Sequence, residues 1–241
     1  MFSFHLDFPF TVGRDNLPDD NSLFYFIPHV QDVGHTLILG PTGGGKSFLL
    51  NFLIAHAQQY GPRTFIFDVG GSYRWLTTLF GGTLVQFRPE QRSFSINPFC
   101  LEPTQANLEF LFAFSKLLVE SGGHKMNDSE ERDLFESIRS LYVLDPEHRR
   151  LLTLSTTVSR VVGNHLKRWT EGEQYGQWFD NVRDDVTFSK FQCIDFEGME
   201  RLGTVLEPLM FYLLHRANEV VYDEALSTTF KLAVVDEAWL F

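Results

Sequence analysis

The sequence predicts an α/β fold in which a parallel sheet is interrupted by an all-α insertion. Short apolar runs alternate with helical patterns over residues 36–87, and this β-α-β-α-β order is typical of a parallel sheet with helices on its faces. Residues from about 104 to 180 show almost only helical patterns. The α/β alternation then returns between residues 191 and 235.

The first part of the chain holds the elements that lead into the sheet. Residues 2–26 contain short apolar and aromatic runs around a turn-rich segment, residues 13–21, which indicates strands or a hairpin. Apolar runs and helical spacing predict the elements that follow. These are a buried strand at 36–39, a helix at 47–60, a strand at 64–67, a helix at 73–79 and a strand at 83–87.

The middle of the chain is predicted to be helical throughout. Thr104 can cap one helix, and Asp128 opens a segment that resembles a capping box for a helix over 132–144. Helical spacing resumes near 151–162 and 165–169. We therefore expect these helices to form an insertion within the α/β domain.

Beyond the insertion we expect a strand at 191–196, a long helix at 202–222 and an apolar strand at 232–235. Pro208 either kinks the long helix or marks a later start, because proline lacks the N–H that a helix interior needs. The patterns divide the chain into three segments. They are 1–103, the first part of the α/β domain with its N-terminal strands, 104–186, the insertion, and 187–241, the second part of the domain.

Composition narrows the functional classes. The chain has 20 Lys and Arg against 31 Asp and Glu, a formal net charge of −11, so it is not an obvious nucleic-acid binder. A local basic stripe would not show in that net charge. Cys100 and Cys193 lie far apart without a CxxC pattern, which indicates reduced thiols of a cytoplasmic protein. The eight histidines form no i,i+4 pair, so protein ligands alone predict no metal site.

No targeting or membrane-spanning segment is predicted. The N-terminus has no basic stretch followed by an apolar one, so it is not a signal peptide. The most apolar helical run, 206–221, is interrupted by Glu207 and Arg216 and is too short and charged to span a bilayer. Any membrane contact is therefore expected to be peripheral.

A glycine-rich segment fits GxxxxGK[ST], the Walker A loop. Glycines let the backbone curl so that N–H groups point inward, and the positive end of the next helix faces the same anion. Lys46 is expected to reach the β- and γ-phosphates and Ser47 to bind Mg²⁺. An ordinary glycine turn is the alternative, but the predicted flanking strand and helix argue against it. The predicted nucleotide-binding residues are Gly40, Pro41, Thr42, Gly43, Gly44, Gly45, Lys46, Ser47 and Phe48.

Asp236 and Glu237 follow the last apolar strand, which is the Walker B pattern. We expect Asp236 to hold Mg²⁺, through water, and Glu237 to orient and deprotonate the attacking water. Two acidic residues at a strand end are common by themselves, so this prediction depends on the Walker A loop. A glutamate next to the aspartate favours hydrolysis over kinase chemistry, because hydrolysis must activate a water. The predicted catalytic residues are Glu237 and Lys46.

Other charged residues are weaker candidates. Asp68 and Asp195 also end predicted strands, where ligands bind in open α/β sheets, although an ordinary turn residue at a strand end is the more common explanation. A neighbouring subunit could receive an arginine finger from this chain. The candidates for that finger, most of them expected to be solvated surface residues, are Arg74, Arg88, Arg92 and Arg201.

Several stretches of sequence resemble a known family. They are, in order, DVGHTLILGPTGGGKSFLLNFL, FIFDVGGSYRWL, FSINPF, IDFEGME, LEPLMFYLLHRAN and VVDEAWLF. Together they resemble the TrbE/TraC-type conjugal transfer ATPases of type IV secretion systems, which include the VirB-type secretion ATPases. The resemblance covers most of the chain from about Asp32 onward and is least distinctive in the helical insertion. The matching functional positions are Gly40, Gly45, Lys46, Ser47, Asp236 and Glu237.

The resemblance implies a RecA-like, FtsK/HerA-class motor that uses ATP and Mg²⁺. It implies a homo-hexamer when full length, located in the cytoplasm at the inner membrane with other secretion subunits, where it energises pilus biogenesis and substrate transfer. The chain ends at Phe241, whereas family members continue with a further strand that carries a polar sensor, so we expect a fragment that lacks the C-terminal part of the core. On its own it is expected to be marginally stable and to hydrolyse ATP poorly.

Two other functions stay open at this point. The first is a FtsK/HerA-type DNA-translocating ATPase, which the acidic balance of the chain does not support. The second is a non-hydrolysing docking module whose nucleotide site only switches its assembly state. DNA-stimulated turnover would favour the first, and function without hydrolysis would favour the second.

Overall fold

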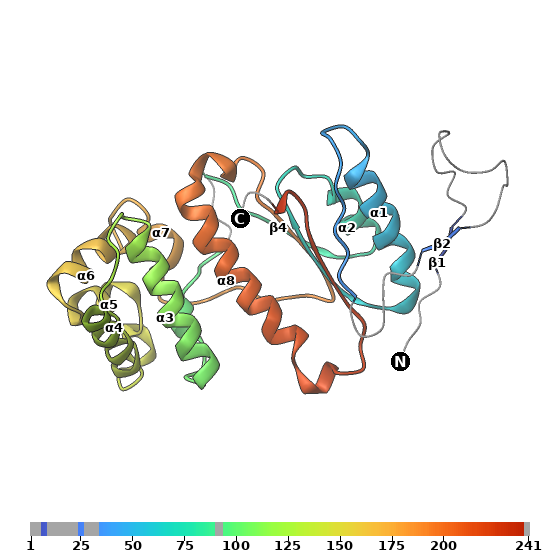
Figure 1. Ribbon diagram of the computed structural model, residues 1–241. Helices are drawn as coiled ribbons and strands as arrows, with labels where there is room; N and C mark the ends of the chain where they lie inside the picture. The colour runs from blue at the N-terminus through green and yellow to red at the C-terminus, as the bar shows by residue number, and fades with distance from the viewer. Residues whose placement is uncertain (1–5, 9–23, 27–33, 90–93, 239–241) are drawn as a thin grey trace. The chain divides into compact units, whose positions relative to one another are not determined.

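The computed structural model describes residues 6–8, 24–26, 34–89 and 94–238, and the chain forms two compact units, residues 1–60 and 61–241. The elements of the first unit are β1 (Leu6–Phe8), β2 (Phe24–Phe26) and α1 (Lys46–Ala57). The elements of the second unit are β3 (Arg63–Asp68), α2 (Arg74–Leu79), β4 (Thr83–Gln86), α3 (Gln105–Glu120), α4 (Asp128–Leu141), α5 (Leu151–Thr157), α6 (Arg160–Leu166), α7 (Gly176–Phe179), β5 (Phe191–Asp195), α8 (Gly203–Val221) and β6 (Lys231–Val235) (Figure 1).

Among the described residues of the first unit, two strands form a short antiparallel pair, and the helix α1 follows the glycine loop. β1 pairs with β2, with Leu6 opposite Phe26, so the expectation of strands within residues 2–26 is confirmed for these six residues. The turn-rich segment 13–21 lies outside the described residues. The predicted helix at 47–60 is also confirmed, because α1 begins at Lys46 and a short 3-10 helix continues it to Tyr60.

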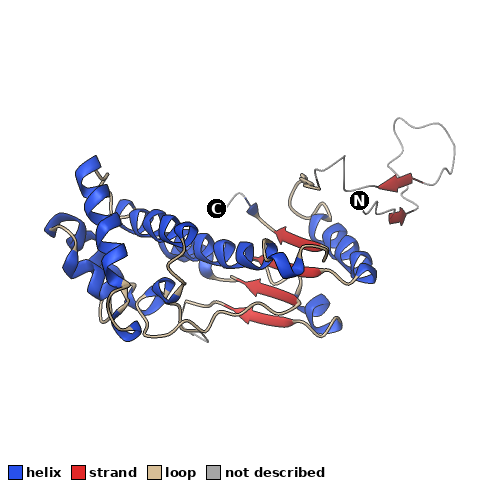
Figure 2. Ribbon diagram, turned by 90° about the horizontal axis from the view of Figure 1, so that it is seen from below, coloured by secondary structure: helices blue, strands red, loops and turns tan. Residues whose placement is uncertain are grey.

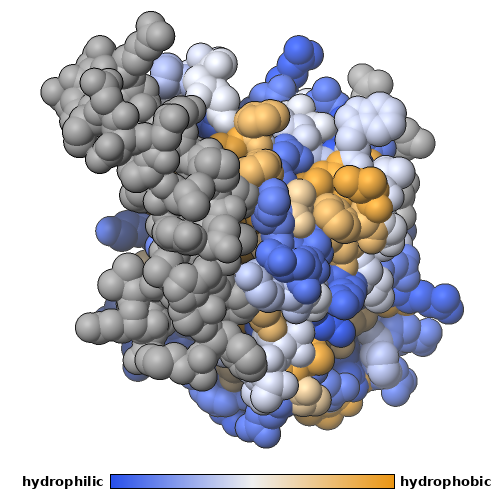
Figure 3. All heavy atoms as spheres, turned by 90° about the vertical axis from the view of Figure 1, so that its right-hand side faces the viewer, coloured by the Kyte–Doolittle hydropathy of each residue, from blue (hydrophilic) through white to orange (hydrophobic). Residues whose placement is uncertain are grey.

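The predicted buried strand at 36–39 is wrong. These residues have no regular secondary structure, and Leu37 and Leu39 are 79% and 82% exposed. A strand exists only where a neighbouring strand accepts and donates the ladder hydrogen bonds, and none of the described residues pairs with this segment. Leu37 and Leu39 are not alone in this, because other large apolar side chains are exposed as well. Figure 3 shows apolar patches, in orange, on one face of the molecule.

The second unit is built on a four-stranded parallel sheet with the strand order β4-β5-β3-β6 (Figure 2). The strands match the predicted runs at 64–67, 83–87, 191–196 and 232–235 to within a residue or two at each end. β3 is central and buried from Thr64 to Asp68, because an inner strand of a parallel sheet is covered on both faces. The predicted parallel α/β sheet is therefore confirmed.

Helices cover both faces of this sheet. α8 lies on one face and α2 on the other (Figure 1). Phe65 and Phe67 of β3 are fully buried in the same hydrophobic cluster as Leu206 and Leu209 of α8. The cluster continues into α3–α7, so the helical segment and the sheet share one core.

The first two helices of the helical segment, α3 and α4, begin at side-chain caps. Thr104 caps α3 as predicted, because its hydroxyl accepts the N–H of Asn107 at 3.2 Å. The predicted box at Asp128 is displaced by one residue. Asn127 is the cap of α4, its side chain accepts the N–H of Glu130 at 3.1 Å, and the Glu130 carboxylate accepts the Asn127 N–H in return. The helix therefore starts earlier than the predicted 132–144 and ends at Leu141.

The predicted helical segment 151–162 is two helices, α5 and α6, rather than one. The helix breaks at Ser159, whose N–H donates to the Asp133 carboxylate at 2.7 Å instead of to a helical carbonyl. Gly163 lets the two helices touch, because a Cβ at this position would lie 2.3 Å from the Ser155 carbonyl oxygen. Neither of these two contacts can be predicted from the spacing of apolar residues along a helix.

Pro208 lies inside α8, which begins at Gly203, so the alternative of a later helix start is wrong. A proline six residues into a helix lacks the N–H that would bond the carbonyl one turn earlier. Among the described helices, none combines the length and the apolar character that crossing a membrane requires, and this includes α8.

His215 of α8 gives the fold a pH-dependent contact. Its ring stacks on Phe110 of α3 with the centroids 3.7 Å apart, and its Nε2 lies 2.8 Å from the Asn107 side-chain oxygen. Burial lowers the pKa of His215 below its usual 6.5. The unfolded chain therefore takes up this proton more readily, and stability is lost as the pH falls below about 6.5 toward the depressed pKa.

We expect His215→Gln to reduce this pH dependence, because glutamine keeps a polar side chain but does not titrate. Urea unfolding of the parent chain and the variant at pH 7.5 and 5.5 checks it. The free-energy difference between the two proteins should shrink at pH 5.5. An equal difference at both pH values would contradict the expectation.

Candidate functional site

The glycine loop of the first unit has backbone geometry that only glycine adopts readily. Gly43 and Gly45 have φ angles of +77° and +85°, in the left-handed region that side chains disfavour. The N–H of Gly44 donates to the Pro41 carbonyl at 3.0 Å and closes the turn. A Cβ on Gly44 would lie 3.0 Å from that same oxygen, so a side chain here would push against the Pro41 carbonyl. The sequence pattern therefore follows from the shape of the loop.

Lys46 folds over this loop. Its Nζ donates to the carbonyl oxygens of Gly40 and Pro41 at 3.2 and 3.3 Å, so the ammonium stands over the turn. Gly45 precedes α1, and the first turn of the helix has no acidic residue that would offset the positive end of the helix. The loop therefore fits an anion such as a phosphate group.

The remaining predicted loop residues lie at the surface or near it. Thr42 is exposed, and Ser47 is half-buried at the start of α1. Phe48 is 79% exposed, so its ring is available to contact a base or a partner. The structure thus brings Gly40 through Phe48 together in one loop and helix start, as their adjacency in sequence requires.

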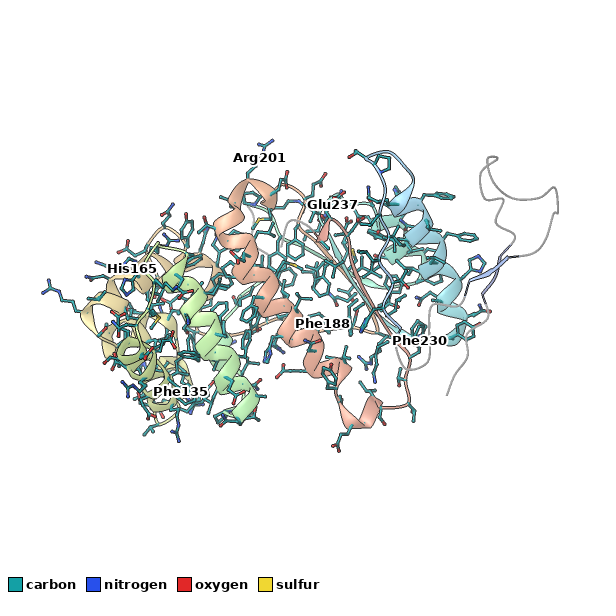
Figure 4. All side chains as sticks on the ribbon, viewed as in Figure 1. Phe135, His165, Phe188, Arg201, Phe230 and Glu237 are labelled. Atoms are coloured by element: carbon teal, nitrogen blue, oxygen red, sulfur yellow. The ribbon has the colours of Figure 1, made fainter. Side chains whose placement is uncertain are left out.

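The second unit presents Asp236 and Glu237 at the carboxyl end of β6. Asp236 is 6% exposed, and its N–H donates to the Phe67 carbonyl at 2.9 Å, which extends the β3–β6 ladder by one residue. Glu237 follows in a turn at the end of β6 (Figure 4). Its φ is +52°, the left-handed conformation, and it is the only non-glycine residue with a positive φ among those described. Such a conformation costs about 1 kcal/mol or more and is typical of functional sites.

Asp236 carries two hydrogen bonds on separate oxygens. The Tyr73 hydroxyl donates to Oδ2 at 2.9 Å, and the Glu237 N–H donates to Oδ1 at 2.9 Å. Carboxylate oxygens suit Mg²⁺ and its bound waters, and these two bonds hold this carboxylate in one orientation. The residue therefore fits its predicted role toward Mg²⁺.

Asp68 and Asp195 both lie at this carboxyl edge, as expected. Asp68 is fully buried, and the N–H groups of Gly70 and Tyr73 donate to its carboxylate. Burial raises the pKa of Asp68, the two backbone bonds oppose this, and the charges of Asp195 and Asp236 add to the rise.

The pKa of Asp195 shifts in the opposite direction, and arginines are part of the reason. Arg88 donates to its Oδ2 at 2.9 Å and Arg74 at 2.8 Å. Burial alone would raise the pKa of Asp195, but the hydrogen bonds from Arg88, the Glu197 N–H, Gln86 and Arg74 outweigh it and lower the pKa. Arg74 and Arg88 also contact Glu197, so both arginines are paired inside this chain.

The four arginines proposed as a finger thus differ in position. Arg74 and Arg88 bind Asp195, and Arg92 lies outside the described residues. Arg201 is exposed beside the start of α8 and projects outward (Figure 4). Sequence reasoning missed Tyr73, because its position at the start of a short helix gave no sign that its hydroxyl contacts a residue 163 positions away.

Within the described part of the chain, no three His, Cys, Asp or Glu residues form a group that could hold a metal ion by themselves. Cys193 is buried and Cys100 is exposed, and neither forms a disulfide.

These features define a P-loop domain. Residues 29–161, more than half of the chain, match the family described as the TraG P-loop domain, and the chain belongs to that family. Curated relatives include the type IV secretion system protein VirB4 of Bartonella quintana, which is 30% identical over 224 residues. The conjugal transfer protein TrbE of Rhizobium radiobacter is also 30% identical, over 222 residues. These matches confirm the resemblance stated from sequence.

The matches cover 90% and 88% of this chain but 28% and 26% of the two relatives, so the chain spans about a quarter of their length. A solved structure, VirB4 of Thermoanaerobacter pseudethanolicus, superposes with a TM-score of 0.65 and 21% identity. That superposition covers 83% of this chain and 59% of the other. It shows the fold and agrees with the expected RecA-like α/β class.

Proposed function

We propose that this chain binds ATP with Mg²⁺ and hydrolyses it as the motor part of a type IV secretion or conjugal transfer ATPase. The observation that carries the proposal is the loop at residues 40–47, where left-handed glycines, a lysine and a helix start without an acidic residue suit an anion. The left-handed Glu237 next to a buried Asp236 supports hydrolysis rather than binding alone.

In this proposal, the loop residues bind the phosphates and the metal, and the acidic pair binds the metal and activates water. Lys46 holds the β- and γ-phosphate oxygens, and the loop N–H groups bind the remaining phosphate charge. Ser47 and Asp236 hold Mg²⁺, which neutralises phosphate charge when bound. Glu237 orients the attacking water and accepts its proton.

The wider assignment rests on the relatives and their names. We propose that the full-length protein works as a homo-hexamer with other type IV secretion subunits, peripheral to the inner membrane on the cytoplasmic side. There it would energise pilus biogenesis and substrate transfer. The division into 1–103, 104–186 and 187–241 stays part of this proposal, with the middle segment as an insertion into the motor.

Binding of a fluorescent ATP analogue and ATP turnover test the proposal, each with and without Mg²⁺. They should be measured on this chain and on a version extended beyond Phe241. We expect both forms to bind the nucleotide and the extended form to turn it over faster. Failure of both forms to bind would overturn the proposal.

A second experiment, with DNA present, distinguishes the proposal from a DNA-translocating ATPase. Turnover is measured with and without double-stranded DNA at 50 and 200 mM salt. Stimulation that falls steeply with salt would indicate a DNA pump, because phosphate contacts release counterions. With a formal net charge of −11, we expect no stimulation.

A further inference from the structure

Three buried carboxylates lie side by side at the carboxyl edge of the sheet. The ladder pairs Asp68 of β3 with Asp195 of β5, and the bond from the Asp236 N–H to the Phe67 carbonyl places Asp236 on the other side of Asp68. Their exposed fractions are 0%, 0% and 6% for Asp68, Asp195 and Asp236. Since like charges at close range repel, each carboxylate needs its own means of stabilisation.

The three carboxylates are stabilised in different ways. Asp195 is neutralised by the guanidinium groups of Arg74 and Arg88. Asp68 is bound by backbone N–H groups in a fully buried position. Asp236 is oriented by the Tyr73 hydroxyl and the Glu237 backbone N–H, which donate to separate oxygens and so set the plane of the carboxylate. Of the three, Asp236 is the one that the Walker B pattern assigns to the metal, because it directly precedes Glu237 at the end of β6.

Tyr73 connects two members of this row. Its side chain is fully buried, so the hydroxyl has a fixed position. The hydroxyl donates to Asp236 Oδ2 at 2.9 Å, while the backbone N–H of the same residue donates to Asp68 Oδ2 at 3.3 Å. Tyr73 thus holds the β3 and β6 carboxylates at a set spacing.

We propose that Tyr73 is a positioning residue for the metal in the function proposed above: its hydroxyl holds Asp236 in the orientation that receives hydrated Mg²⁺. Tyr73 touches neither nucleotide nor metal in this proposal and acts through Asp236. Partners that orient a metal-binding carboxylate in this way commonly change metal affinity by about 10- to 100-fold when removed.

Tyr73→Phe removes the hydroxyl and keeps the ring. We expect the affinity for Mn²⁺, a paramagnetic substitute for Mg²⁺, to fall about tenfold in the presence of a non-hydrolysable ATP analogue, as measured by electron paramagnetic resonance. Turnover should need about tenfold more Mg²⁺ for half-maximal rate, with nearly full rate restored at saturating Mg²⁺. A purely structural role would lower the maximal rate or the stability and leave the Mg²⁺ requirement unchanged.

Tyr212→Phe is the matched control. Tyr212 is equally buried, and its hydroxyl also donates to a buried aspartate, Asp184, away from the strand ends. We expect Tyr212→Phe to lower the melting temperature and to leave Mn²⁺ affinity unchanged. Unchanged Mn²⁺ affinity in Tyr73→Phe, or an equal loss in both variants, would overturn the inference alone. If the parent chain binds neither nucleotide nor Mn²⁺, the proposed function fails first, and the inference with it.

Discussion

Glu237→Gln is expected to bind ATP and Mg²⁺ as the parent chain does and to hydrolyse ATP about 10²- to 10⁴-fold more slowly. Glutamine has the shape of glutamate and can still orient a water molecule, but it cannot accept the proton. The backbone contact from the residue 237 N–H to Asp236 Oδ1 does not involve the side chain, so it should persist in the variant.

The measurement is ATP turnover together with equilibrium binding of a fluorescent ATP analogue, in the extended form if this chain alone turns over too slowly. Glu224→Gln is the control, because Glu224 is an exposed glutamate in the short 3-10 helix before β6. Full turnover in Glu237→Gln would remove Glu237 from the chemistry. Loss of nucleotide binding in that variant would instead assign it a structural role.

Lys46→Ala is expected to weaken nucleotide binding by about 10- to 100-fold, because it removes a charge-assisted bond to phosphate. In the structure its Nζ contacts the carbonyl oxygens of Gly40 and Pro41 at the surface, so its loss should leave the unfolding free energy nearly unchanged. Titration with the fluorescent ATP analogue, combined with urea unfolding, measures both quantities.

Lys167→Ala is the control for Lys46→Ala, since the Lys167 side chain is 68% exposed and lies in the helical segment. Unweakened binding in Lys46→Ala would contradict the phosphate role of the loop. A further experiment tests whether full-length protein that carries Lys46→Ala supports transfer in cells. Support for transfer would favour the non-hydrolysing docking module over the motor.

Each strand that sequence predicted correctly pairs with at least one described neighbour in the parallel sheet. Residues 64–67 lie within β3, which pairs with β5 on one side and β6 on the other. Residues 36–39 are as apolar, but no described strand pairs with them. An apolar run predicts that a segment tends to be buried. Whether it forms a strand also depends on partner strands that lie far away in sequence. The helix break at Ser159 has the same origin, because its acceptor, Asp133, lies on another helix.

The candidate site shows the same difference between features set by local contacts and features set by contacts between distant residues. The loop from Gly40 to Ser47 was predictable because the described hydrogen bonds of Gly44 and Lys46 join residues only a few positions apart. The Asp236–Glu237 pair was predictable because it directly follows an apolar strand. Tyr73 was not predictable, since its role depends on a hydrogen bond across 163 residues. The pairing of Arg74 and Arg88 with Asp195 likewise depends on tertiary contacts.

The left-handed backbone of Glu237 has a consequence for protein engineering. Glycine or asparagine adopts its φ of +52° with less strain than glutamate, so either replacement would stabilise the fold by up to about 1 kcal/mol. A variant library screened only for heat resistance would therefore enrich proteins that have lost the proposed water-activating carboxylate. Screening for turnover and for melting temperature would then favour opposite residues at this position, so any stabilisation of this chain should hold residue 237 fixed.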